Sequence, residues 1–307
     1  MMTHTNSTRV KAPTESALVP STSSLRTDED ITLNSTERAL LDYERGKKRK
    51  NLFLSCKLNI RVSTLNVRTL RPAGRLEELA RNFQVYGSEI LGIIDHKLVH
   101  PDETIQIRSL DKCTLFTGSA RRTESGGALG GVGILVSKRV EKLISDVKLH
   151  SERILQVDIC GNPKVSIIVT YAPVNGSDQA EDFFQTLGSV TNNIPKHNMV
   201  IAMGDFNSHI GRDIAKHTYH ETTNSNGELF QEYAQECNLM IANVSFQKRK
   251  GKLWTYFSEM NNCKTQIDYI LVNRKWKNSV KDIEAFNHYS SLGSDHRVVT
   301  MKIKLSL

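Results

Sequence analysis

Four short segments of the sequence carry acidic, amide or imidazole side chains at the ends of apolar stretches. They are Leu65-Asn66-Val67, Gly204-Asp205-Phe206-Asn207, Gln266-Ile267-Asp268-Tyr269-Ile270 and Gly293-Ser294-Asp295-His296. Hard cations such as magnesium prefer carboxylate and amide oxygens, and histidine titrates near neutral pH. An Asp-x-Asn step also places two oxygen-bearing groups on one side of an extended chain. These are the groups that a metal-assisted hydrolysis uses as base, ligands and charge stabiliser.

Each segment alone also has a purely structural interpretation. An isolated Asp-Phe-Asn is usually a turn or a helix cap, and an isolated Asp-His is usually a surface pair. Asp268 is harder to explain, because a carboxylate flanked by apolar strand residues needs a partner. That partner is as easily a structural arginine as a catalytic histidine. The catalytic interpretation rests on all the segments occurring together, in order, each at a strand boundary.

The elements that must position these residues are visible as short apolar segments from residue 56 onward. The predicted strands are LNIRVSTLN, EILGIID, GVGILVSK, ILQVDIC, KVSIIVTYA, NMVIAMGD, NLMIANV, QIDYILV and VVTMKIKL. Helical spacing of apolar residues predicts helices over 74–86, 179–190 and 227–237. Ten or more strands with interspersed helices predict two packed sheets with helices outside them.

Residues 1–55 differ in composition from the rest of the chain. They are rich in Ser, Thr, Asp and Glu and end in the basic run KKRK at 47–50. We predict a disordered polar tail over 1–55 and a single catalytic domain over 56–307. The basic run fits a nuclear-import signal or a DNA-tethering arm, and it fits a solvated linker equally well. We expect an intracellular, nuclear protein.

Composition limits the class of protein. The 307 residues carry a formal net charge of +8, which favours a polyanionic partner such as nucleic acid, although solubility alone explains it as well. The five cysteines are odd in number and form no CxxC pair, so a reducing compartment is favoured over a zinc site or a disulfide framework. No apolar run is long enough for a bilayer, so we expect no membrane association, and nothing indicates an obligate protein partner.

GDFN, IDYI and SDH, in this order, resemble the motif series of the endonuclease/exonuclease/phosphatase superfamily. Within it, the chain resembles endonuclease domains of non-long-terminal-repeat retrotransposons and the craniofacial development protein 2-like group. STLNVRTL, TYAPVN, MGDFNSHIG and TQIDYILVNRKW carry this resemblance. It implies a DNase I-like fold, a four-layer α/β sandwich in which two packed mixed β-sheets are flanked by helices. It also implies a Mg²⁺-dependent phosphodiesterase, with Mn²⁺ as a substitute, that nicks DNA.

The resemblance assigns roles at the catalytic centre. Asp205 resembles the general base that orients the attacking water, and Asn207 resembles a stabiliser of the transition state. Asp268 resembles the carboxylate that orients the catalytic histidine, and His296 resembles that histidine. Tyr171, in Tyr-Ala-Pro, resembles the tyrosine that contacts the phosphate.

The resemblance also assigns metal ligands, with one departure. Asn66 and Asp295 resemble metal-side residues, but Asp95 stands where the superfamily usually has Glu. Asp retracts the carboxylate by on the order of 1 Å, which can cost about a hundredfold in rate. A deeper or water-mediated metal, DNA binding without cleavage, and help from His96 all remain open. We favour weakened but retained activity, because the other motif residues are present.

DNA is the expected substrate because the chain is basic and because basic residues lead into an aromatic segment at 247–254. The predicted nucleic-acid contacts are Arg153, Asn243, Lys248, Arg249, Lys250 and Trp254. For any single basic residue of this set we favour a solvated loop as the explanation, and Asn243 is equally explained as a turn or strand-end residue. Two alternatives remain: a phosphatase of the same superfamily, and a catalytically impaired nucleic-acid-binding remnant of retrotransposon origin.

Overall fold

The computed structural model describes residues 53–55, 57–101 and 105–306. The predicted tail over 1–55 therefore lies almost entirely outside the described residues, and so does the basic run at 47–50. Where the description begins, Phe53 and Leu54 are buried among core side chains. The division into a tail and a catalytic domain stays a prediction. Within the described residues, no helix is both long enough and apolar enough to cross a membrane.

One sheet has seven strands and is mixed. In spatial order they are β16 (Val280–Phe286), β17 (Val298–Ile303), β1 (Ile60–Asn66), β2 (Ile90–Ile94), β7 (Val132–Ser137), β4 (Cys113–Thr117) and β3 (Gln106–Ser109). β1 and β2 are parallel, and the remaining neighbours are antiparallel. The sequences of β2 and β7 are almost continuously apolar because both faces of these strands are covered.

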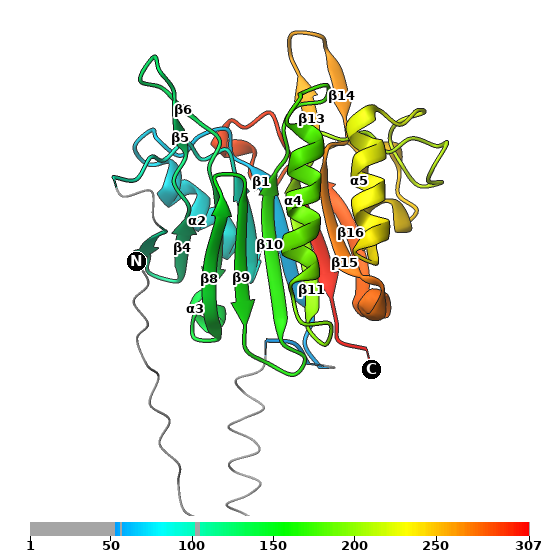
Figure 1. Cartoon of the computed structure of the whole chain (residues 1–307). Helices are drawn as coiled ribbons and strands as arrows, with labels where there is room; N and C mark the ends of the chain where they lie inside the picture. The colour runs from blue at the N-terminus through cyan, green and yellow to red at the C-terminus, as the bar shows by residue number, and fades with distance from the viewer. Residues whose placement is uncertain (1–52, 56, 102–104, 307) are drawn as a thin grey trace, which may run out of the picture. The chain divides into compact units, whose positions relative to one another are not determined.

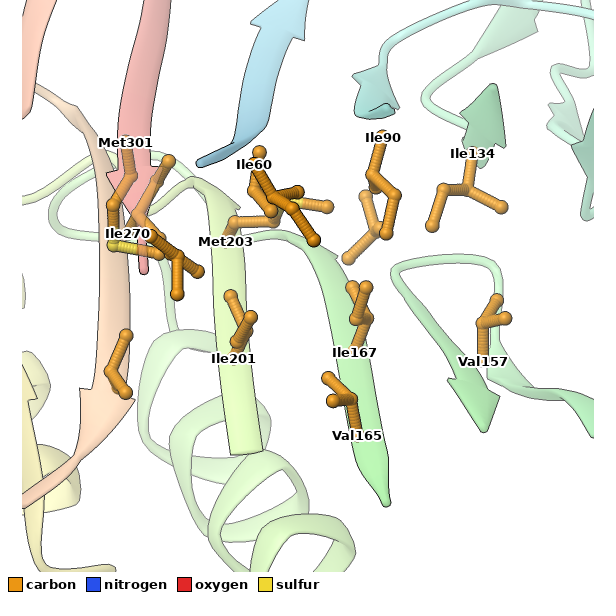
Figure 2. Close-up of a cluster of buried hydrophobic side chains, with 14 of the residues drawn as sticks. Ile60, Ile90, Ile134, Val157, Val165, Ile167, Ile201, Met203, Ile270 and Met301 are labelled. Carbon is orange, nitrogen blue, oxygen red and sulfur yellow. The ribbon is translucent and has the colours of Figure 1, made fainter. Parts of the chain in front are cut away.

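The other sheet has six strands and is also mixed. Its spatial order is β12 (Leu239–Ile241), β15 (Asp268–Asn273), β11 (Met199–Asp205), β10 (Val165–Tyr171), β9 (Ile154–Ile159) and β8 (Ile144–Ser151). β10 and β11 are parallel, and the other neighbouring pairs are antiparallel. The two sheets pack face to face, and their apolar inner side chains form the largest core. In Figure 2 this core contains Ile60, Ile90, Ile134, Val157, Val165, Ile167, Ile201, Met203, Ile270 and Met301.

Helices form the two outer layers. α4 (Ala180–Asn192) and α5 (Ser225–Glu236) pack on the outer face of the six-stranded sheet, as Figure 1 shows. α2 (Arg75–Val85) packs on the outer face of the seven-stranded sheet through apolar residues at helical spacing. α5 begins where the Asn224 side chain accepts a hydrogen bond from the Gly227 N–H, at 2.8 Å. The predicted four-layer arrangement is confirmed.

Shorter elements connect these layers. They are α3 (Lys138–Glu141), the hairpin of β5 (Arg121–Arg122) and β6 (Ala128–Leu129), the hairpin of β13 (Tyr256–Ser258) and β14 (Cys263–Thr265), and four 3-10 turns, η1 (Ala242–Ser245), η2 (Lys250–Lys252), η3 (Arg274–Ser279) and η4 (Ser290–Leu292). In Figure 1 the two hairpins rise from the same edge of the sheets, opposite the edge that carries α3. The three predicted helices and the nine predicted strands are all present.

Candidate active site

Three neighbouring strands of the six-stranded sheet carry predicted site residues at one level. Tyr171 at the end of β10 pairs in register with Asp205 at the end of β11. Asp205 in turn pairs with Asp268, the first residue of the antiparallel β15. Side chains at the same level of adjacent strands are neighbours. Residues from three separate motifs therefore meet at one sheet edge.

Gly204 is required for this arrangement. A Cβ at Gly204 would lie 1.9 Å from the carbonyl oxygen of Thr170, its register partner on β10. No side chain fits at that distance, so the strand ending in Asp205 can approach β10 only with glycine at this position. The glycine of the GDFN motif thus has a packing role next to the acidic residue.

Asn66 links the two sheets at this edge. It ends β1 in the seven-stranded sheet, and its Nδ2 donates to Asp205 Oδ2 across the sheet interface at 3.1 Å. Its Oδ1 accepts from the backbone N–H of Arg68 at 2.9 Å. Asn207 donates its own backbone N–H to Asp205 Oδ1 at 3.0 Å and its side-chain Nδ2 to the Ala172 carbonyl oxygen at 2.9 Å. Both Asp205 oxygens are thereby held in place.

His296 lies between two carboxylates. Its Nδ1 is 2.9 Å from Asp268 Oδ2, and its Nε2 is 3.9 Å from Asp205 Oδ2. The imidazole is only 7% exposed. Asp268 is fully buried, and its second oxygen, Oδ1, has no hydrogen-bond partner among the described residues. Ligand atoms of these three residues lie within 4.8 Å of one another. Among the described residues, the partner of the Asp268 carboxylate is thus a histidine and not an arginine.

Burial and charge set the protonation of this group. Burial acts to lower the pKa of His296, but the negative charge and hydrogen bond of Asp268 outweigh it and raise that pKa to about 9. Burial and the nearby Asp268 charge raise the pKa of Asp205 to about 7, against the opposing effects of His296 and Asn66. Near neutral pH the imidazole is therefore a cation, and Asp205 is a carboxyl group able to exchange a proton.

Asp95 directly follows β2 at the same edge, on the seven-stranded sheet. Its Oδ1 accepts the Gly130 N–H at 3.1 Å, and its Oδ2 is 3.2 Å from Lys97 Nζ. Burial raises its pKa, and the positive charges of Lys97 and His296 oppose that effect. Burial raises the pKa of the Tyr171 phenol, and the nearby negative charges of Asp205 and Asp95 raise it further. Its hydroxyl therefore stays protonated and available as a donor.

Asp295 is the second predicted metal-side carboxylate. Its Oδ2 lies 3.4 Å from Arg68 Nη1, and its side chain is 22% exposed. Its charge contributes to the raised pKa of His296, which follows it in the sequence. Asn66 is hydrogen-bonded to Asp205, and the charges of Asp95 and Asp295 interact with that of His296, so these oxygen-bearing side chains lie at the same edge as the His296 group. An oxygen-rich donor set of this kind fits a hard divalent cation such as Mg²⁺.

The predicted nucleic-acid contacts are distributed differently. Arg249 and Lys250 are exposed, but Lys248 is an internal ion-pair partner of Asp282 and Glu284 and is 18% exposed. Asn243 is buried, and its side chain bonds the backbone of β15 at Asp268 O and Ile270 N. This geometry gives Lys248 and Asn243 structural contacts and does not support direct contacts with nucleic acid.

Trp254 and Arg153 contact residues that adjoin or belong to the candidate site. The Arg297 guanidinium lies 4.2 Å from the centroid of the Trp254 ring. Arg153 donates to the Tyr171 carbonyl oxygen at 3.1 Å, and its guanidinium lies 5.5 Å from the Tyr171 ring centroid. Arg153 therefore supports the strand end that carries Tyr171.

Sequence reasoning missed several residues of the site. The hydroxyl of Thr255 accepts the backbone N–H groups of Ile267 and Asp268, which fixes the start of β15. Tyr256 bridges to His296, with ring centroids 4.8 Å apart. Nothing in the sequence spacing indicates these contacts. Arg68 and Lys97 were also missed, although each follows a predicted metal-side residue, Asn66 or Asp95, by two positions, and that spacing was a usable signal.

The amino-acid sequence is similar to one family model and to curated proteins. A family model described as "Endonuclease-reverse transcriptase" matches residues 165–300. Craniofacial development protein 2 of Bos taurus is 28% identical over 261 residues, which are 82% of this chain and 42% of that protein. The chain therefore spans less than half the length of the curated relatives it matches.

Solved structures share the fold. The 3′ phosphatase NExo from Neisseria, bound to a product DNA hairpin, aligns with a TM-score of 0.60 and 19% identity over 80% of this chain and 99% of that chain. The endonuclease domain of TRAS1, a telomere-specific non-LTR retrotransposon, aligns with a TM-score of 0.57 and 15% identity over 81% of this chain and 99% of that chain. The predicted resemblance to the endonuclease/exonuclease/phosphatase superfamily and the predicted DNase I-like fold are both confirmed.

Proposed function

We propose that this chain is a divalent-metal-dependent phosphodiesterase that nicks DNA, and that it is of retrotransposon origin. The observation that carries the proposal is the buried group in which His296 lies between Asp268 and Asp205, at an edge where Asn66 joins the two sheets. Hydrolysis of a phosphodiester requires a positive charge near the phosphate, here the His296 imidazolium, together with a titratable carboxyl group and oxygen ligands for a metal ion.

Asp205 acts as the base in this proposal. Its raised pKa lets it take a proton from an attacking water near neutral pH. The hydrogen bonds from Asn66 and from the Asn207 backbone N–H keep its two oxygens in fixed directions. Asn207 has a positive φ of 47°, a conformation that asparagine tolerates better than most residues. Its side chain donates to the Ala172 carbonyl oxygen and would act as a stabilising group for the reacting phosphate.

His296 acts as a fixed cation. Asp268 holds its Nδ1, which leaves Nε2 facing Asp205 and the space where the phosphate would lie. An imidazolium in a nearly water-free position stabilises negative charge developing on the phosphoryl oxygens. The protonated hydroxyl of Tyr171 is a second donor toward the same oxygens. These two groups would bind the substrate phosphate without changing their own protonation.

Asp95, Asp295 and Asn66 are the residues that would hold the metal, Mg²⁺ or Mn²⁺. When bound, such an ion neutralises charge on the phosphoryl oxygens and supports the leaving oxygen. The chain's own contribution is to offer the oxygens of Asn66 and Asp95 at the ends of β1 and β2, and that of Asp295 in the segment that carries His296. Asp95 in place of a longer Glu is the feature expected to weaken activity.

DNA is proposed as the substrate on the basis of charge. The net charge of +8 and the exposed Arg249 and Lys250 favour a polyanion. The NExo structure contains a product DNA hairpin, and TRAS1 is a retrotransposon, which agrees with this choice for the present chain. A nuclear location would follow from such a substrate.

A plasmid-nicking assay tests the proposal. Supercoiled plasmid should be converted to open circles with Mg²⁺ or Mn²⁺, and a chelator should stop the conversion. His296→Ala should reduce nicking strongly, whereas His197→Ala, which changes an exposed histidine, should leave it unchanged. Salt-sensitive DNA binding without any nicking would mean a non-catalytic binding module. Turnover of small phosphoesters without DNA binding would mean a phosphatase.

A further inference from the structure

Arg68 and Lys97 have an unusual backbone conformation at the candidate site. Among the described residues, the non-glycine positions with positive φ are Arg68 (62°), Asp95 (57°), Lys97 (58°), Asn207 (47°), Asn238 (52°) and Asn262 (45°). Asparagine and aspartate adopt this conformation most readily, so Arg68 and Lys97 are the exceptions in that set. Strained positions of this kind persist where surrounding structure enforces them, and they concentrate at functional sites.

Each of these two turns brings a cation to a predicted metal-side carboxylate. Lys97 Nζ lies 3.2 Å from Asp95 Oδ2, and Arg68 Nη1 lies 3.4 Å from Asp295 Oδ2. The Lys97 side chain is 27% exposed and its Asp95 partner is 12% exposed, so this pair is partly shielded from water. Each carboxylate that the proposed function assigns to the divalent ion is thus already paired with a cation of the chain itself.

The surrounding backbone holds the Lys97 turn in place. The Gly130 N–H donates to Asp95 Oδ1 at 3.1 Å, and the Lys97 N–H donates to the Gly130 carbonyl oxygen at 3.0 Å. Gly130 follows the β5–β6 hairpin, so the hairpin end and the Asp95 turn are bonded in both directions. On the other turn, the Arg68 N–H donates to Asn66 Oδ1 at 2.9 Å. Hydrogen bonds therefore fix the backbone of both turns from which these cations reach their carboxylates.

We propose that Lys97 and Arg68 are built-in counter-ions that compete with the divalent cation for Asp95 and Asp295, and that the cations released on metal binding pair with substrate phosphates. This inference rests on the proposed function of the same site. A divalent ion must displace these ion pairs, so its apparent affinity is its intrinsic affinity multiplied by the fraction of sites in which the pairs are open. A phosphate that accepts the released ammonium removes that competition. Metal and DNA should therefore strengthen each other's binding.

Isothermal titration of the full chain with Mn²⁺ alone tests the competition. Lys97→Met keeps the length of the side chain and removes its charge. It should bind Mn²⁺ more tightly than the wild type by about 1.4-fold to fivefold, the range expected for losing one partly exposed ion pair. Arg68→Gln should shift the affinity in the same direction by a smaller factor, because Arg68 is 61% exposed. Damage to the fold would weaken metal binding, so the expected sign separates the two causes.

Lys142→Met is the matched control. Lys142 is exposed, follows α3 at the opposite edge of the sheets, and loses the same charge on substitution (Figure 1). It should leave Mn²⁺ affinity within error of the wild type. Thermal unfolding in chelator, compared across the variants, checks that each one is folded.

The coupling between metal and DNA is measured in the same proteins. Anisotropy of a labelled DNA duplex should show tighter binding with Mn²⁺ than with chelator in the wild type, and Lys97→Met should lose most of that difference. Unchanged or weaker Mn²⁺ binding by Lys97→Met, in a wild type that binds Mn²⁺ and nicks plasmid, overturns this inference and leaves the proposed function intact. Absence of Mn²⁺ binding in both proteins overturns both.

Discussion

Asp205 and Asp268 are register partners at the adjoining ends of β11 and β15, and one imidazole contacts both of them. His296 is 2.9 Å from the Asp268 carboxylate and 3.9 Å from that of Asp205. Two buried carboxylates this close repel each other, and an imidazolium between them relieves the repulsion. The sharing is unequal: Asp268 hydrogen-bonds the imidazole, whereas Asp205 has a raised pKa. One carboxylate therefore orients and charges the histidine while the other remains free to exchange a proton.

Replacing Asp268 by Asn should remove the charge that keeps His296 protonated. The pKa of His296 should fall below its present value near 9, because burial then acts with less opposition. Nicking at neutral pH should drop by about a hundredfold to a thousandfold, the range for losing one group that stabilises negative charge in the transition state. Single-turnover nicking rates and an NMR titration of His296 measure the two effects. Asp178→Asn, which changes an exposed carboxylate, is the control. An Asp268→Asn protein with an unaltered His296 titration contradicts this role.

The pH profile of nicking should be bell-shaped. Asp205 must be deprotonated to act as base, so activity should rise as pH increases through about 7. His296 must be protonated, so activity should fall as pH increases through about 9. The plateau should lie between these values. Measurements of kcat/KM across this range at saturating Mn²⁺ give the profile. In Asp268→Asn the descending limb should move to lower pH, and a profile with no descending limb in the wild type would falsify the assignment to His296.

The sequence contains the site residues and the apolar strands, but not the contacts that decide their roles. Strands such as β2 and β11 are predictable because both of their faces are buried and their sequences are continuously apolar. β3 is exposed at every position and has no apolar period, so it was missed. That Asp205 faces Asp268 depends on the register between β11 and β15, which no local pattern gives.

Charge patterns in the sequence show the same limit. Lys248 belongs to a run of basic residues that predicts a phosphate-binding loop, yet its ammonium is paired with Asp282 and Glu284 of β16. Conversely, Arg68 and Lys97 stand outside any basic cluster and contact the carboxylates of the site. Folded geometry sets the partner of most charged side chains, and the close spacing of Asp95 and Lys97 is an exception that the sequence does show.

Asp95→Glu should increase nicking. The carboxylate of Asp95 is held back by the Gly130 N–H and by Lys97. One added methylene advances it by about 1 Å toward the metal position, a shift that can restore up to about a hundredfold in rate. The rate at limiting Mn²⁺ should rise most, because metal affinity should improve as well. Asp95→Asn, which keeps the shape and removes the charge, should lower the rate under the same conditions. If Asp95→Glu is no faster than the wild type at any metal concentration, Asp95 is not the weak point of the site.

The basic segment at 247–254 should divide into residues that bind DNA and one that stabilises the fold. Arg249 and Lys250 are exposed, so Arg249→Gln and Lys250→Gln should each reduce the slope of log affinity against log salt by about 0.9 if each contacts one phosphate. The nicking rate at saturating DNA should not change. Lys248→Met should leave the salt slope alone and lower the melting temperature, because Asp282 and Glu284 lose a shared partner. Salt-dependent anisotropy and thermal unfolding measure the two quantities. A reduced slope in Lys248→Met, or a lower melting temperature in Arg249→Gln, would reverse this assignment.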